Sequence, residues 1–204
     1  MARGGASAVS RRPYRAGRTA AIVLRGFPSP RRSGSNGRMV DVVLPPPGQF
    51  LREDAIRGGM DLLLFANVHH LRRADEKLSE LGLGRAHHRV LYFVGRRPDM
   101  AVSELLTVLA ITKQSLGRVT KDLARKELLE QHASERDRRR RLLRLTPAGA
   151  ALERALFDDL HANVARAYAA AGGEAVAGFW AFMQHLIGDD GRAQFRAVQG
   201  QNAS

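Results

Sequence analysis

An α+β fold, mainly helical with one small β-hairpin, is predicted by three features of the sequence. Apolar residues recur at helical spacing from Gln49 onward. Two short segments typical of β-strands flank a polar loop in the second half of the chain. The chain has 204 residues, of which 44% are hydrophobic, so it is long and apolar enough to bury a core.

The composition excludes several classes of protein. Because the chain has no cysteine, it cannot form a disulfide scaffold, a thiolate zinc site, an iron–sulfur cluster or a cysteine nucleophile. The longest nearly uninterrupted apolar stretch, Leu62 to Val68, is far shorter than the roughly 18–20 residues that a membrane-spanning helix needs. We therefore expect a soluble protein. Its formal net charge of +13 favours a polyanionic partner such as nucleic acid.

Most of this charge lies in residues 1–38, which contain nine arginines and no acidic residue. The segment is rich in Gly, Ser and Pro and lacks apolar periodicity, so we expect residues 1–48 to form a disordered arm. Ser10-Arg11-Arg12 resembles a twin-arginine export signal, but the apolar run that follows, Thr19 to Leu24, is too short for one. A mitochondrial transit peptide has a similar composition and stays open as an alternative.

A series of helices is predicted by the spacing of the apolar residues. The first, about 50–81, has a stripe formed by Leu64, Val68, Leu71, Leu78 and Leu81. The remaining helices are expected over about residues 85–96, 102–109 and 112–126, from Thr146-Pro147 to Gly172-Gly173, and over about 174–188.

The helix over about 112–126 has two contrasting faces. Thr112 is a suitable N-cap, and Leu116, Val119 and Leu123 form an apolar side. The opposite side is polar and basic, and it carries Lys113, Gln114, Gly117, Arg118 and Lys121. Such a face suits the major groove of DNA, although an ordinary solvated helix face is the alternative.

The segments 128–132 and 141–146 are typical of two strands, joined by a polar loop over 133–140. Between Arg136 and Arg144 there are six arginines and a single acidic residue, Asp137. Two short helices followed directly by a basic hairpin describe a winged helix-turn-helix.

The flanking helices carry apolar stripes that are wide for exposed helices. In the last predicted helix the stripe consists of Val176, Phe179, Trp180, Met183, Leu186 and Ile187. Packing within one chain is the alternative, but a thin winged domain cannot cover all of this surface, so we expect a second subunit to cover it. In a twofold dimer, the basic helix over about 112–126 of each subunit faces one of two DNA half-sites about 34–36 Å apart. This arrangement predicts a pseudo-palindromic operator.

The segment 81–153 resembles the MarR family of bacterial transcriptional regulators. The resemblance is strongest in ITKQSLGRVTKDL (111–123) and in ERDRRRRLLRLTPAG (135–149). It implies that the recognition helix enters the major groove and that a wing-tip arginine, Arg138 or Arg139, reaches the minor groove, held by Asp137. It also implies dimerisation through the terminal helices and an apolar effector cleft between the dimer and DNA-binding regions.

The chain departs from the family pattern at two positions. Many relatives have an aspartate where this chain has Ser134. Relatives commonly have glycine where this chain has Glu127, at the turn from the recognition helix to the wing. A residue other than glycine costs about 1 kcal/mol at that position if its φ is positive.

These inferences divide the chain into five parts. We expect an Arg-rich arm at 1–48, an N-terminal dimerisation helix at 49–84, the winged helix-turn-helix at 85–147, C-terminal dimerisation helices at 148–188 and a flexible tail at 189–204. The candidate DNA-binding residues are Thr112, Lys113, Gln114, Ser115, Arg118 and Lys121 on the recognition helix, and Arg136, Asp137, Arg138, Arg139, Arg140 and Arg141 on the wing. Lys121 and Arg125 are expected to contact the DNA backbone or to remain solvated.

No catalytic constellation is present. Ser103 and Ser115 lack the context of a nucleophile elbow, and the sequence has neither a phosphate-binding glycine loop nor a placed carboxylate pair. In the pairs His69-His70 and His87-His88, adjacent side chains on a helix point about 100° apart and cannot chelate a metal alone. We expect no enzymatic activity, no cofactor and no metal site.

We therefore predict a cytoplasmic, nucleoid-associated regulator that binds specific double-stranded DNA as a homodimer. It is either a repressor or an activator, and a small-molecule effector modulates it. The alternative function is that of a non-specific architectural DNA- or RNA-binding protein that acts through the Arg-rich arm.

Overall fold

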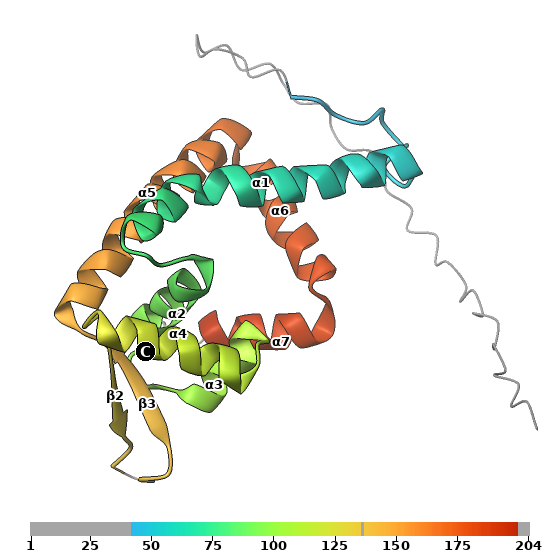
Figure 1. The fold of residues 1–204 in the computed structure, drawn as a ribbon. Coiled ribbons are helices and arrows are strands. Elements are labelled where there is room, and N and C mark those ends of the chain that lie inside the picture. Colours follow the sequence, from blue (N-terminus) through green and yellow to red (C-terminus); the bar gives the residue numbers. More distant parts are fainter. Residues whose placement is uncertain (1–41, 136, 200–204) are drawn as a thin grey trace, which may run out of the picture. The chain divides into compact units, whose positions relative to one another are not determined.

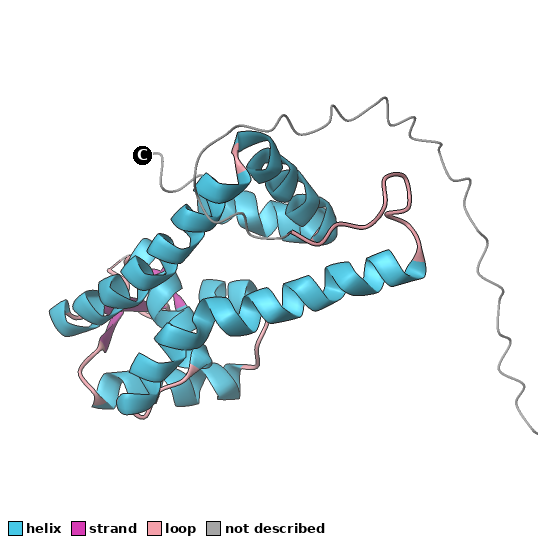
Figure 2. Cartoon of the chain, turned by 90° about the horizontal axis from the view of Figure 1, so that it is seen from above, coloured by secondary structure: helices cyan, strands magenta, loops and turns pink. Residues whose placement is uncertain are grey.

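Apolar spacing and capping residues place most helices where the sequence predicts them (Figures 1 and 2). The computed structural model describes residues 42–135 and 137–199, so residues 1–41 of the expected arm lie outside the described residues. The elements in chain order are α1 (Glu53–Glu80), α2 (Arg85–Arg96), β1 (Met100–Ala101), α3 (Val102–Leu109), α4 (Lys113–Arg125), β2 (Leu129–Ala133), β3 (Arg141–Leu145), α5 (Pro147–Ala171), α6 (Gly173–Leu186) and α7 (Gly188–Gln199). The predicted class, mainly helical with a small β-hairpin, is confirmed.

The core lies where α2, α3 and α4 pack against the sheet. Val90, Leu91 and Val94 of α2 are fully buried, and so is Leu105 of α3. The same cluster contains Leu116, Val119 and Leu123 of α4, and Leu143 of β3. Because α4 uses its apolar side in this core, its opposite side faces away from the protein.

The sheet has three antiparallel strands in the order β1-β3-β2. In β2 and β3, Leu129 lies opposite Leu145, so the predicted hairpin is confirmed. The strand β1 was not predicted, because two residues are too few to show a pattern. It pairs Met100 with the buried Leu143 and thereby joins the base of the hairpin to the helical core.

The helix α5 begins directly after the hairpin and leads to the C-terminal helices (Figure 1). Thr146 caps it as predicted, since its side chain accepts the backbone N–H of Gly149 at 3.0 Å. A Cβ at Gly149 would lie 1.9 Å from the carbonyl oxygen of Leu128, so this close approach of helix and hairpin requires glycine. Farther along, the Asp159 carboxylate accepts the ammonium group of Lys77 on α1 at 2.7 Å.

The predicted stripe on α1 is buried at one position only, and its last member, Leu81, lies just beyond the helix and is 42% exposed. Leu78 is fully buried, whereas Leu64 is 64% exposed and Val68 is 53% exposed. No residue of α6 is buried, although Phe179 and Trp180 belong to its predicted stripe. None of the described helices combines the length and the apolar character needed to cross a membrane.

The expected flexible tail at 189–204 is wrong for most of its length, since α7 occupies Gly188–Gln199. Asp189 and Asp190 lie in its first turn, where negative charge favours the helix N-terminus. Arg192 donates to the carbonyl oxygen of Gln184 at 2.9 Å and so ties α7 to α6. The apolar residues of this segment are too few to give a periodic signal.

Candidate nucleic-acid interface

The helix α4 is the second helix of a helix-turn-helix. The turn from α3 passes through Ala110, which adopts a left-handed conformation with φ 51°. Thr112 then caps α4 as predicted, because its hydroxyl oxygen accepts the backbone N–H of Ser115 at 3.2 Å. The Thr112 hydroxyl also donates to the Ser115 hydroxyl oxygen at 2.9 Å, so both side chains stabilise the start of this helix.

The outer face of α4 is polar, basic and open to solvent. All five candidate side chains within the helix are exposed, namely Lys113, Gln114, Ser115, Arg118 and Lys121. A Cβ at Gly117, which lies among them, would meet no atom within 4 Å. The structure therefore brings these candidates together on one unobstructed face.

His87 of α2 lies beside the C-terminal half of α4. His87 accepts the backbone N–H of Gly84 through Nδ1 at 3.1 Å, and its Nε2 lies 3.6 Å from Oδ2 of Asp122. Asp122 also pairs with Arg125. Arg125, expected to contact the DNA backbone or remain solvated, is thus engaged at the C-terminal end of α4.

The wing consists of β2, β3 and the loop between them, and its tip is shaped by Asp137. The Asp137 carboxylate accepts the backbone N–H of Arg139 at 3.0 Å, and its backbone carbonyl accepts the N–H of Arg140 at 2.9 Å. Ser134 closes the loop by donating its N–H to the carbonyl oxygen of Arg140 at 3.0 Å. Asp137 was expected to hold a guanidinium group. In the described part of the wing, which leaves out Arg136, it holds the backbone instead.

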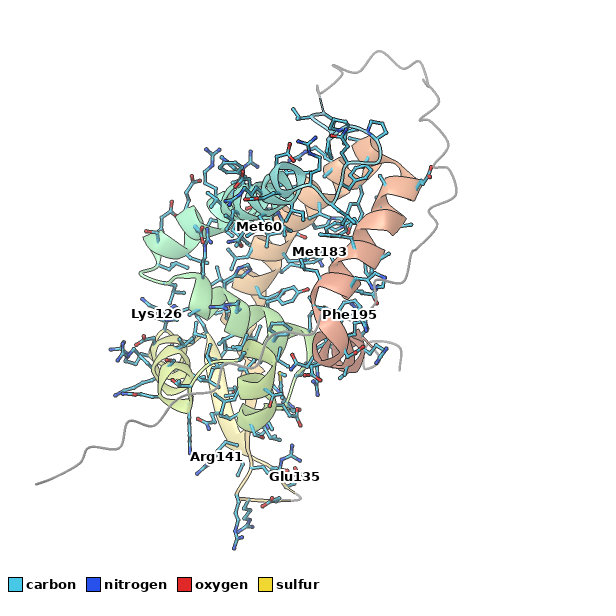
Figure 3. The ribbon with its side chains drawn as sticks, turned by 90° about the vertical axis from the view of Figure 1, so that its right-hand side faces the viewer. Met60, Lys126, Glu135, Arg141, Met183 and Phe195 are labelled. Atoms are coloured by element: carbon cyan, nitrogen blue, oxygen red, sulfur yellow. The ribbon has the colours of Figure 1, made fainter. Side chains whose placement is uncertain are left out.

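The wing arginines differ in their surroundings. Arg140 donates to Glu104 on α3 at 2.9 Å, so it is paired within the protein. Arg138, Arg139 and Arg141 are exposed and have no ion pair to another described residue. Figure 3 shows Arg141 and Glu135 at the end of the wing, whereas Met60 and Met183 lie on the flanking helices.

Two acidic residues that contact the wing were missed by the sequence analysis. Asp99 accepts two hydrogen bonds from Arg144 of β3, at 3.1 and 2.5 Å, and lies 3.0 Å from Nε2 of His132 on β2. The Arg144 guanidinium lowers the pKa of the Asp99 carboxyl below its ordinary value. The second residue is Glu104, described above. Ion pairs between residues so far apart in sequence leave no periodic signal.

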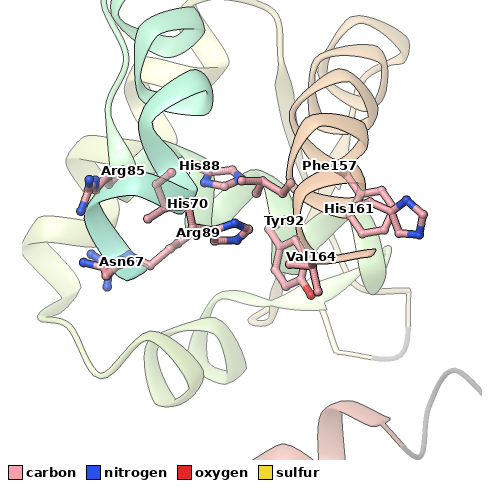
Figure 4. A pocket seen from close by; sticks show the side chains of 11 residues that line it. Asn67, His70, Arg85, His88, Arg89, Tyr92, Phe157, His161 and Val164 are labelled. Atoms are coloured by element: carbon pink, nitrogen blue, oxygen red, sulfur yellow. The ribbon is translucent and has the colours of Figure 1, made fainter. Parts of the chain in front are cut away.

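A cavity of about 590 Å³ lies between α1, α2 and α5 (Figure 4). Its walls combine apolar side chains with basic and hydrogen-bonding groups, and the lining includes Leu71, Arg85, His88, Arg89, Tyr92 and Phe157. Asp75 holds the Arg85 guanidinium at 2.7 Å. Burial lowers the pKa of His88, so its imidazole favours the neutral form here. No group of three or more metal-ligating side chains occurs among the described residues.

A second hollow of about 630 Å³ lies between α1, α5 and α6 and is mainly apolar. Its walls include Leu63, Val164, Tyr168, Phe179 and Met183.

Comparison with known proteins is consistent with this architecture. A model of the MarR family matches residues 81–140. The HTH-type transcriptional regulator PetP of Rhodobacter capsulatus is 37% identical over 150 residues, which cover 74% of this chain and 90% of that regulator.

Solved structures share the fold. Streptococcus pneumoniae FabT in complex with DNA superposes with a TM-score of 0.58 at 22% identity, covering 66% of this chain and 94% of that one. A mutant MarR from E. coli complexed with operator DNA has a TM-score of 0.52 at 24% identity, covering 66% and 96%. At these identities the likeness supports the winged fold and assigns no contact to individual residues.

Proposed function

Because the chain belongs to the MarR family of transcriptional regulators, we propose that it binds a specific, pseudo-palindromic operator as a homodimer. Membership in this family of non-enzymatic DNA-binding regulators agrees with the expectation that the chain is not an enzyme. The observation that carries the proposal is that the exposed basic face of α4 is followed by a wing, the hairpin of β2 and β3, whose loop also exposes arginines.

In this proposal α4 reads base edges in the major groove. The amide of Gln114 can pair with adenine, and the guanidinium of Arg118 can pair with guanine, each through two hydrogen bonds. Lys121 lies nearer the C-terminal end of α4 and is assigned to phosphates. On the wing, Arg138 or Arg139 is assigned to the minor groove, since a narrow groove attracts a single arginine.

The homodimer is supported by the apolar surface of the flanking helices. Leu62, Leu64 and Phe65 of α1 are more than 60% exposed, and Phe182 and Leu186 of α6 are more than half exposed. A monomeric protein rarely exposes apolar side chains in such continuous groups. We assign this surface to a second copy, in which 49–84 and 148–188 form the dimerisation region and 85–147 binds DNA.

Modulation by an effector is supported by the cavity between α1, α2 and α5. Its walls come from two flanking helices, α1 and α5, and from α2, which belongs to the proposed DNA-binding region. A small molecule that prefers one arrangement of these helices would shift the population competent for DNA. Mixed apolar and hydrogen-bonding walls are typical of small-molecule sites.

Binding of the full-length chain to the region upstream of its own gene tests the proposal. Fluorescence anisotropy at physiological salt should show a preference of about 1,000-fold or more over scrambled DNA of equal length. Equal affinity for both would contradict specific recognition and favour the non-specific alternative. A shortened chain of residues 39–204 separates the two contributions, because specificity kept without the arm assigns it to the winged domain.

A further inference from the structure

Two carboxylates outside the assigned DNA-binding residues contact the guanidinium groups of the wing. Asp99 lies in the turn between α2 and β1, and Glu104 lies on α3. Both are only partly exposed, and both place negative charge beside a surface assigned to a polyanion. Negative charge there opposes phosphate binding, so these two residues cannot contribute by attracting DNA and must act in another way.

Asp99 connects both long strands of the wing to the helical core. Its carboxylate accepts Nε of Arg144 at 3.1 Å and Nη2 at 2.5 Å, and it lies 3.0 Å from Nε2 of His132. Its backbone N–H donates to the carbonyl oxygen of Leu143 at 3.0 Å. Asp99 has φ 64°, a left-handed conformation that aspartate and asparagine tolerate better than most residues.

Glu104 makes a second connection, closer to the tip of the wing. One carboxylate oxygen accepts Arg140 at 2.9 Å, and the other accepts Arg97 at 3.2 Å. The side chain of Arg97 is only 18% exposed, so this end of the network is fixed in the protein. Because Glu104 belongs to α3, the contact links the wing to the helix-turn-helix itself.

The strand pairing leaves the wing in need of such connections. Apart from the hairpin, the described sheet contains only β1, which has two residues, and a two-stranded hairpin is marginally stable by itself. Like charges on Arg138, Arg139 and Arg141 also repel one another. Carboxylate contacts at the base and near the tip restrict the directions that the wing can take.

We propose that Asp99 and Glu104 are positioning residues that hold the wing at a fixed angle to α4, so that its arginines reach DNA while α4 occupies the major groove. This inference rests on the proposed DNA-binding function. Preorganisation of this kind lowers the cost of ordering the wing when DNA binds. The two acids therefore raise affinity although their charge has the unfavourable sign.

The sign of the effect on binding tests the inference. Asp99→Asn keeps the size and the left-handed tolerance of the side chain, and Glu104→Gln keeps its length, so both variants should fold. Each should weaken binding of the full-length chain to the upstream DNA fragment about five-fold or more, although each adds one unit of positive net charge. The slope of log affinity against log salt should also fall, because phosphate contacts of the wing are lost.

Glu135→Gln is the matched control. Glu135 is exposed in the loop between β2 and β3 and has no ion pair to another described residue, so its loss changes the charge of the wing without removing a connection to the core. It should leave affinity unchanged or raise it. Arg140→Gln tests the second connection from the opposite side, and the double variant with Glu104→Gln should bind no more weakly than the weaker single variant.

The outcomes are distinct. If Asp99→Asn and Glu104→Gln bind DNA as tightly as the wild type or more tightly, as expected for the control, the inference is overturned. The two acids would then only reduce the positive charge of the wing. A wild-type chain that prefers the upstream fragment no more than scrambled DNA would instead overturn the proposed function. Melting temperatures measured alongside should agree within a few degrees, which separates positioning from loss of the fold.

Discussion

Glu127 occupies a position where its side chain is a disadvantage. It adopts φ 57° between α4 and β2, a left-handed conformation that is costly for any residue other than glycine. Its carbonyl oxygen accepts the hydroxyl of Thr146 at 2.6 Å, so the turn is held in this conformation by the start of α5. Backbone hydrogen bonds at the end of α4 also close the turn, since the N–H of Leu128 donates to the carbonyl oxygen of Leu123 at 3.0 Å and that of Glu127 donates to the carbonyl oxygen of Ala124 at 3.0 Å. These contacts keep the turn left-handed although its residue is not glycine.

Replacing this residue with glycine should stabilise the protein. Glu127→Gly removes the penalty for a left-handed non-glycine residue and should raise the free energy of unfolding by about 0.5–1 kcal/mol. Chemical denaturation of both proteins in parallel measures the difference. Unchanged or reduced stability would mean that the greater freedom of glycine in the unfolded chain outweighs the relief.

Gln114 and Arg118 are the residues assigned to base reading. Replacing either by alanine should cost about 1–3 kcal/mol on the upstream fragment and little on scrambled DNA. Lys121→Ala serves as the comparison, since loss of a phosphate contact should weaken both DNAs alike and lower the salt slope by about one. Equal losses on both DNAs for Gln114→Ala and Arg118→Ala would remove the base-reading assignment.

At the scale of elements, the wing shows how a loop can depend on one acceptor. Because Asp137 accepts a backbone N–H, Asp137→Ala should loosen the tip and weaken binding to the upstream fragment about two- to five-fold, although positive charge increases. Asp137→Asn keeps an acceptor oxygen and should bind nearly as well as the wild type. Anisotropy at matched salt compares the three proteins.

Other outcomes have clear meanings. If both variants bind more tightly than the wild type, Asp137 acts only by opposing phosphate charge. If Asp137→Asn weakens binding as much as Asp137→Ala does, the negative charge matters and a guanidinium partner in the complex replaces the backbone contact.

The elements with strong local signals could be predicted from the sequence. Thr112 and Thr146 marked the starts of α4 and α5, and apolar spacing located α2 and α3. The strand β1 and the helix α7 could not be predicted, because one has two residues and the other has few apolar ones. The pairs made by Asp99 and Glu104 also escaped prediction, since folding alone brings such distant residues together.

At the scale of the whole molecule, the sequence predicted apolar stripes but not which parts of them one chain would bury. Leu78 is covered by the chain's own core, whereas Leu64 and Phe65 are exposed on the same helix. Which residues are buried depends on where α5 crosses α1, and the spacing of apolar residues in the sequence does not reveal this crossing point. The exposed remainder is the surface that we assign to a second copy.

Light scattering after size exclusion should give about twice the chain mass of 22.4 kDa at micromolar concentration. Replacing Leu64 and Phe65 together by serine should shift the protein toward a monomer, because it removes exposed apolar side chains from α1. Ser79→Ala, at an exposed site near the end of the same helix, provides the control. A well-folded wild-type monomer would contradict the dimer.

The continuity of α5 has a mechanical consequence. Its 25 residues form one rod about 37 Å long, with the wing at its start and α6 at its end. A rotation of this rod by about five degrees about its far end displaces its start by roughly 3 Å, close to the rise of about 3.4 Å per base pair of DNA. A small shift of the flanking helices, of the size of a side-chain movement, would therefore move the DNA-binding region by about one base-pair step relative to its half-site.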